Sequence, residues 1–101
     1  MEHALLTLSV SPALEEELVD WFLETRSSGF TTWHAQGVGG NPEEMSLAEQ
    51  VAGRQRRLIF KLHGPPDTLK ACLAKLKKDY PNADIHFWLH PLLDAGNLKT
   101  M

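Results

Sequence analysis

The stretch Ala4-Leu-Leu-Thr-Leu-Ser-Val-Ser-Pro12 joins the pattern of a strand directly to the start of a helix. Every second residue from position 6 to position 10 is Leu or Val, which is the period of a half-buried strand. Ser11 and Pro12 then match the preferred N-cap and the preferred first residue of a helix. The sequence therefore predicts a strand over residues 4–10 and a helix over residues 12–26, where apolar residues recur at helical spacing.

Outward from this unit, the chain predicts three more strands and one more helix. Thr and aromatic residues favour the second strand, alternation favours the third and fourth strands, and helical spacing favours the second helix. The order βαββαβ with right-handed crossovers predicts an α+β fold, the ferredoxin-like plait: a four-stranded antiparallel sheet with two helices on one face. These elements are predicted at residues 30–36 (strand), 54–62 (strand), 66–80 (helix) and 85–90 (strand).

The composition restricts the chain to a small globular class. Residues 1–101, with a formal net charge of −3, have the length of a single domain. Cys72 is the one cysteine, which excludes a disulfide within the chain, a zinc ribbon and an iron–sulfur cluster. No apolar run approaches the roughly 20 residues of a membrane span, and the first residues lack a signal-peptide pattern. The mildly acidic balance argues against a nucleic-acid partner. Because neither a membrane span nor a signal peptide is indicated, we expect a cytoplasmic domain without membrane insertion.

One connection, residues 37–53, is long for a compact domain. It begins with Gly37-Val-Gly-Gly-Asn-Pro42, in which three of the first four residues are glycine. A connection of this length is usually functional or mobile. We expect Asn41 to cap a short helix that starts at Pro42, and we find no strong pattern in the tail over residues 92–101.

The second face of the predicted sheet carries large apolar residues. Trp33, Ile59 and Trp88 each fall on the side of their strand that points away from the predicted core. Single exposed apolar residues are normal, so scattered exposure is one interpretation. The other is an interface between copies of the chain, because a face that gathers large apolar side chains usually meets a partner.

Histidines offer one candidate metal site. His86 and His90 lie four residues apart on the last strand and therefore share a face, but they stand about 13 Å apart along it. One subunit cannot bring both to a single ion, whereas copies related by symmetry could gather them together with His34. Neutral imidazole binds Cu, Zn or Ni. The alternative is that these are ordinary histidines at an interface or its rim.

Arg54, Arg56 and Arg57 form the one dense basic cluster. Arg54 and Arg56 point to one side of the predicted strand, and Arg57 points to the other. At the base of the long connection, these arginines could clamp a carboxylate or phosphate group bidentately. The alternative is that they pair with Glu43, Glu44 or Glu49 of the connection, or with acidic residues of a neighbouring subunit. No Ser/His/Asp or Cys/His set has a supporting sequence context, so we expect no enzymatic activity.

Three stretches carry a family resemblance: Gly29-Phe-Thr-Thr-Trp33, Ser46-Leu-Ala-Glu-Gln-Val-Ala-Gly-Arg-Gln-Arg-Arg57 after the Gly-rich loop, and Tyr80-Pro-Asn-Ala-Asp-Ile-His-Phe-Trp88. Over residues 5–96 the chain resembles the PII-like superfamily of small plaits that trimerise through the sheet. Within that superfamily it resembles the branch called domain of unknown function 3240. Members of this branch are commonly encoded beside heavy-metal efflux pumps of the resistance–nodulation–division type.

By this resemblance, residues 37–53 correspond to the T-loop, the arm that PII proteins insert into target transporters or enzymes. Ligands of PII proteins bind in the cleft between neighbouring subunits, beside the base of that loop. The resemblance implies a homotrimeric regulatory protein whose partner is a component of a heavy-metal efflux system. The implied residues are Gly37, Gly39, Arg54, Arg56 and Arg57 for the ligand cleft, Glu43, Glu44, Met45 and Leu47 for the partner, and Trp33, Ile59 and Trp88 for the trimer interface.

The connection over residues 79–84 departs from the PII proteins that bind adenine nucleotides. Those proteins carry a loop rich in Gly and Lys/Arg before the last strand, whereas this connection has no glycine and places two carboxylates there. Phosphate sites need backbone N–H groups and cations, so we do not expect ATP binding of the usual kind. The cofactor is left open, with a divalent metal as one option. The alternative function is a small metal-binding protein, similar in fold to the CutA trimers linked to copper tolerance, with His34, His86 and His90 as ligands.

Overall fold

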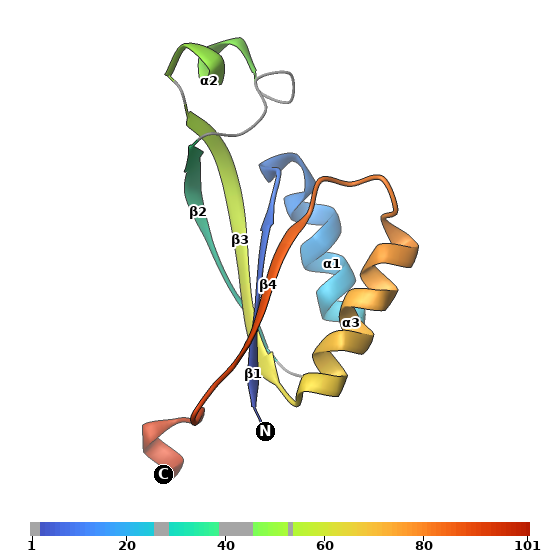
Figure 1. Cartoon of the computed structure of the whole chain (residues 1–101), viewed down its shortest axis with the longest axis vertical. Coiled ribbons are helices and arrows are strands. Elements are labelled where there is room, and N and C mark those ends of the chain that lie inside the picture. The colour runs from blue at the N-terminus through green and yellow to red at the C-terminus, as the bar shows by residue number, and fades with distance from the viewer. Residues whose placement is uncertain (1–2, 26–28, 39–45, 53) are drawn as a thin grey trace.

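The computed structural model describes residues 3–25, 29–38, 46–52 and 54–101, and its centre is one four-stranded antiparallel sheet. The strand order is β2-β3-β1-β4, so β1 and β3 are central and β2 and β4 form the two edges. Figure 1 shows the sheet with its helices on one side. The strands are β1 (Ala4–Val10), β2 (Thr31–Val38), β3 (Arg54–Gly64) and β4 (His86–Pro91).

Two helices, α1 (Glu15–Thr25) and α3 (Pro66–Asp79), cover the same face of the sheet (Figure 1). This arrangement confirms the predicted βαββαβ plait. A third helix, α2 (Leu47–Ala52), lies in the connection between β2 and β3, beyond the end of the sheet that is opposite the chain termini. Short 3-10 turns precede α1, at Pro12–Leu14, and follow β4, at Leu98–Thr100.

The start of the first helical segment is the predicted one, but its geometry differs. The Ser11 hydroxyl accepts a hydrogen bond from the Ala13 N–H at 3.3 Å, as an N-cap does. The backbone then makes one 3-10 turn before the α-helix begins at Glu15. Tight turns of this kind are common where a helix starts.

The second strand is longer than predicted, and this corrects the start of the long connection. Gly37 and Val38 belong to β2, where they pair with Gln55 and Arg54 of β3. The prediction that the connection begins at Gly37 is therefore wrong by two residues. The physical reason is that cross-strand backbone pairing continues through this glycine, although isolated glycines weaken a strand pattern in sequence.

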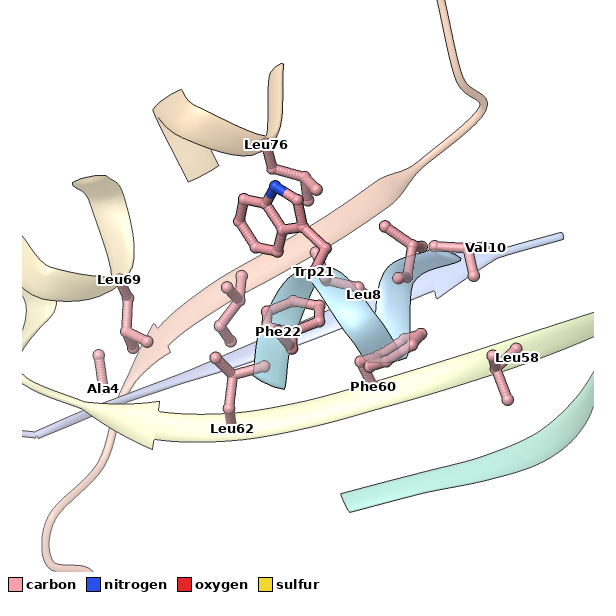
Figure 2. Close-up of a cluster of buried hydrophobic side chains, with 12 residues drawn as sticks. Ala4, Leu8, Val10, Trp21, Phe22, Leu58, Phe60, Leu62, Leu69 and Leu76 are labelled. Carbon is pink, nitrogen blue, oxygen red and sulfur yellow. The ribbon is translucent and has the colours of Figure 1, made fainter. Parts of the chain in front are cut away.

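The core lies between the helices and the covered sheet face. The Phe22 and Phe60 rings stack with centroids 5.1 Å apart, and the Trp21 ring meets Phe22 edge-on at 4.9 Å. Figure 2 shows the buried side chains converging from α1, α3, β1 and β3. Aromatic pairs at such distances add to the stabilisation from burial. The buried core is Ala4, Leu6, Leu8, Val10, Leu18, Trp21, Phe22, Leu58, Phe60, Leu62, Leu69 and Leu76.

The other side of the sheet has no helix over it in the described parts of the chain, and we call it the open face. Strand register places Trp33 opposite Ile59 and places Trp88 opposite Thr7 on this face. The exposed fractions are 43% for Trp33 and 55% for Trp88. The apolar residues predicted on a second face therefore do share one surface.

Candidate functional site

The base of the long connection is built around α2, a helix that starts with a capping box. The Ser46 hydroxyl accepts a hydrogen bond from the Glu49 N–H at 3.2 Å, and the Glu49 carboxylate accepts one from the Ser46 N–H at 2.9 Å. The sequence Ser46-Leu-Ala-Glu49 has the spacing that this reciprocal motif requires. The predicted cap, Asn41, lies outside the described residues, and the described helix begins at Leu47.

The same carboxylate ties α2 to the first residues of β3. Glu49 Oε2 accepts a hydrogen bond from the Arg56 backbone N–H at 2.7 Å and lies 3.5 Å from Arg56 Nε. The Arg56 backbone hydrogen bond, followed by the one from Ser46, lowers the pKa of Glu49 from 4.5 to about 2. We call this set of contacts the Glu49 latch. It joins the second half of the connection to the strand that leads into the core.

A hollow of about 420 Å³ lies beside the Glu49 latch. Two guanidinium groups line it, and each has a polar partner: Arg54 Nη1 donates to Gln36 Oε1 at 3.2 Å, and Arg56 pairs with Glu49. Guanidinium groups bind carboxylate and phosphate groups well. An anion that enters this hollow would therefore compete with Gln36 and Glu49 for the arginines. The hollow is lined by Gln36, Ser46, Ala48, Glu49, Arg54, Gln55 and Arg56.

Arg57 does not belong to this hollow. Its side chain is on the open face, where it is buried with 6% of its surface exposed. It donates from Nε to the Ser9 hydroxyl at 2.9 Å and from Nη2 to the Ser9 carbonyl at 2.6 Å. Asp84 completes the set at 3.4 Å from Nη1 and also lies 3.1 Å from His86 Nε2. A buried charge needs such partners, and these contacts give Arg57 a structural task within its own chain.

Gly37 lies beside that arginine. A Cβ atom at this position would lie 3.4 Å from Arg57 Cγ, which is ordinary contact distance, and nothing in its backbone requires glycine. Gly37 therefore lies in the sheet beside the arginine side chain. It is on the face opposite the hollow, so the structure does not gather the predicted ligand residues into one pocket of a single chain.

The predicted partner-binding residues lie mostly outside the described residues. Gly39, Glu43, Glu44 and Met45 are among those outside. Leu47 is the first residue of α2, and its side chain is 76% exposed. An exposed leucine at the start of a latched helix is available to a partner.

The three predicted metal ligands lie on two opposite faces of the sheet in one chain. His34 is on the edge strand β2 on the helix side, where its Nε2 atom lies 3.7 Å from Glu15. His86 and His90 are on the opposite edge strand, β4, and on the open face. Within the described ranges, no group of three or more His, Cys, Asp or Glu side chains is placed to hold a metal ion.

Sequence reasoning offered Glu49 as one possible partner of the arginines, and the contact between Glu49 and Arg56 confirms that alternative, but it missed the capping role of Glu49 and the role of Asp84. The signal for Glu49 was present, because the capping-box spacing from Ser46 is visible in the sequence. Asp84 had no local signal, because its contact with Arg57 joins residues 27 positions apart. Its role could be found only from the strand pairing.

The fold of this chain is the PII-like plait, a conclusion that solved structures of similar shape support. The nitrogen regulatory PII-like protein CPII from Thiomonas intermedia K12 was solved with ADP, AMP and bicarbonate. It is 12% identical to this chain in sequence, with a TM-score of 0.70, and the match covers 97% of this chain and 98% of CPII. The GlnK–ATP complex of B. subtilis is 16% identical with a TM-score of 0.63, and the coverages are 98% and 91%.

The family follows from the sequence itself. Residues 1–99 match the family described as "Protein of unknown function (DUF3240)", so the chain belongs to the DUF3240 family. The crystal structure of a DUF3240 family protein from Shewanella baltica OS155 is 21% identical, with a TM-score of 0.74 and coverages of 95% and 96%. No curated protein is significantly similar to the chain in sequence. The predicted branch is thus confirmed, and the solved structures confirm the predicted fold.

Proposed function

We propose that this chain is a non-enzymatic regulatory protein of the PII type, which works in the cytoplasm as a homotrimer. Its output element is the connection between β2 and β3, and its input is a ligand bound at the base of that connection. The Glu49 latch is the observation that supports this proposal. One carboxylate joins α2 to the arginine-lined base, so an event at the base acts directly on the connection.

The mechanism is a population shift between two states of the connection. In one state, Glu49 satisfies Arg56 and α2 lies over the start of β3. In the other state, an anionic ligand pairs with Arg54 and Arg56, and α2 is released to present a different surface. A ligand changes this balance only if its affinity for the two states differs. Competition between the ligand and Glu49 for Arg56 supplies that difference.

The ligand is an anion, but we do not propose the usual nucleotide site before the last strand. Two PII-like neighbours were solved with adenine nucleotides. In this chain, Asp79 accepts a hydrogen bond from the Trp21 indole at 2.7 Å and Asp84 pairs with Arg57. Both carboxylates of that connection are thus fixed by contacts within the chain, and they would repel phosphate groups.

The ligand proposal is tested by calorimetry with ADP, inorganic phosphate and citrate as probes. We expect at least one probe to bind wild-type protein and to bind Arg54→Ala/Arg56→Ala at least tenfold more weakly. Lys70→Ala/Lys75→Ala on α3 is the matched control for the loss of two positive charges, and it should bind like wild type. Equal binding by the arginine variant would refute a site at the loop base.

The proposed partner is a component of a heavy-metal efflux system. This choice follows from the resemblance to a family branch that is commonly encoded beside such pumps. The contact surface consists of an acidic and apolar set at the connection: Glu43, Glu44, Met45 and Leu47. Such a set would suit a partner surface that is basic at its rim and apolar at its centre.

A second candidate function is metal binding shared between copies of the chain. The observation that favours it is that His86 and His90 share the open face, the surface on which we propose that copies meet. This candidate predicts that Cu(II), Zn(II) or Ni(II) binds wild type and that His86→Ala/His90→Ala abolishes the binding. His34→Ala tests the third proposed ligand separately. A wild-type protein that gives no heat and no thermal shift with these ions would refute this function.

A further inference from the structure

The last ten residues form an extension that we call the C-terminal arm (residues 92–101). Its apolar side chains point into solvent: the exposed fractions are 104% for Leu93, 85% for Leu98 and 95% for Met101. The arm nevertheless has local order, because Asn97 Oδ1 accepts a hydrogen bond from the Lys99 N–H at 2.9 Å and starts the 3-10 turn at Leu98. An ordered segment that leaves three large apolar side chains in water indicates a missing contact surface.

The arm projects in a defined direction. It continues from β4 beyond the end of the sheet and curves to the side away from α1 and α3 (Figure 1). The Leu92 N–H donates to the His3 carbonyl at 3.0 Å, which fixes the root of the arm against the start of β1. The arm therefore lies beyond the end of the sheet, on the side of the open face.

The open face is a second exposed apolar surface, in addition to the C-terminal arm. Trp33 and Trp88 are about half exposed, and Ile59 lies between the two on the central strand β3. A second copy seated on the open face would lie on the side toward which the arm curves.

We propose that the C-terminal arm is a clasp between subunits, in which Leu93, Leu98 and Met101 of one copy pack against the neighbouring copy that covers its open face. The occupant is a second copy of this chain because the two uncovered apolar surfaces belong to the same chain and face the same side of it. The clasp rests on the homotrimer of the proposed function. It adds to that assembly a contact that the sheet alone does not provide.

The test compares Leu93→Ser/Leu98→Ser with wild type by sedimentation velocity over a dilution series from 0.1 to 100 μM. We expect the variant to dissociate at a concentration at least tenfold higher than wild type does. Leu23→Ser is the control, because this leucine is also exposed but lies on α1, away from the arm. The control should assemble like wild type. Thermal unfolding followed by circular dichroism at low concentration should be the same for all three proteins.

The outcomes separate the clasp from the assembly on which it rests. If wild type assembles and the arm variant assembles equally well, the clasp is refuted and the trimer stands. If wild type is a monomer at 100 μM, both are refuted. A photo-crosslinking residue at position 98 gives an independent readout: we expect products with the mass of two or three chains. Crosslinks found only within one chain would overturn the clasp.

Discussion

Replacing Trp88 by Ser tests whether the open face holds copies of the chain together. Trp88 is 55% exposed in the isolated chain and lies on the open face opposite Thr7. A tryptophan buries up to about 250 Å², so an interface can remove about 140 Å² of it from water. At 25 cal/mol per Å² this burial stabilises the assembly by up to about 3.5 kcal/mol per subunit. In a trimer the total loss is about 10 kcal/mol, which is about seven powers of ten in the association constant.

The assay is light scattering coupled to size-exclusion chromatography at micromolar concentration. We expect wild-type protein to elute with the mass of three chains and Trp88→Ser to elute with the mass of one. Phe87→Ser is the matched control, because Phe87 is the adjacent residue on β4 and is 56% exposed, but it lies on the helix side of the sheet. The two substitutions remove similar exposed area from opposite faces. Dissociation by the Phe87 variant with an intact Trp88 variant would refute the assignment of the open face as the interface.

Three further predictions concern the Glu49 latch, Gly37 and the core. Because the pKa of Glu49 is lowered, its contribution to the Glu49 latch is fully present above about pH 4.5 and is lost as the pH falls through about 2. An NMR titration of the Glu49 carboxyl group should give a midpoint near 2. A midpoint near 4.5 would exclude the latch in solution. Gly37→Ala should change the free energy of unfolding by less than about 1 kcal/mol, because the added Cβ meets Arg57 at ordinary contact distance. A larger loss of unfolding free energy in a denaturant titration would mean that the glycine is required. Phe60→Ala should cost about 3–5 kcal/mol in the same titration, because Phe60 is fully buried among other aromatic rings, and a cost below 1 kcal/mol would contradict its central place in the core.

The order of strands and helices was predictable because each element carries its own local signal. Alternation marked the strands, and the Ser11-Pro12 pair marked the first helical segment. The boundaries of the long connection were not predictable in the same way. Gly37 and Val38 are held in β2 by pairing with β3, and pairing between strands leaves no trace in the local sequence.

The candidate site was predictable only in part, for a related reason. The strand period predicted that Arg57 points away from Arg54 and Arg56, and the structure confirms this; the partners of Arg57 were not predictable. Arg54 and Arg56 line the hollow, whereas Arg57 is buried on the open face by Ser9 and Asp84. The partners of Arg57 come from β1 and from the segment before β4, so only the folded chain brings them together.

The central claim is that the connection between β2 and β3 captures a partner while the rest of the chain maintains the assembly. The most direct measurement is co-purification of a heavy-metal efflux pump of the resistance–nodulation–division type, taken from the same organism, with tagged wild-type protein. The comparison is a variant that replaces Glu43, Glu44, Met45 and Leu47 by Ser. We predict that wild type retains the pump, and that the variant has the same mass by light scattering but retains none. Equal retention of the pump by both proteins would contradict the account.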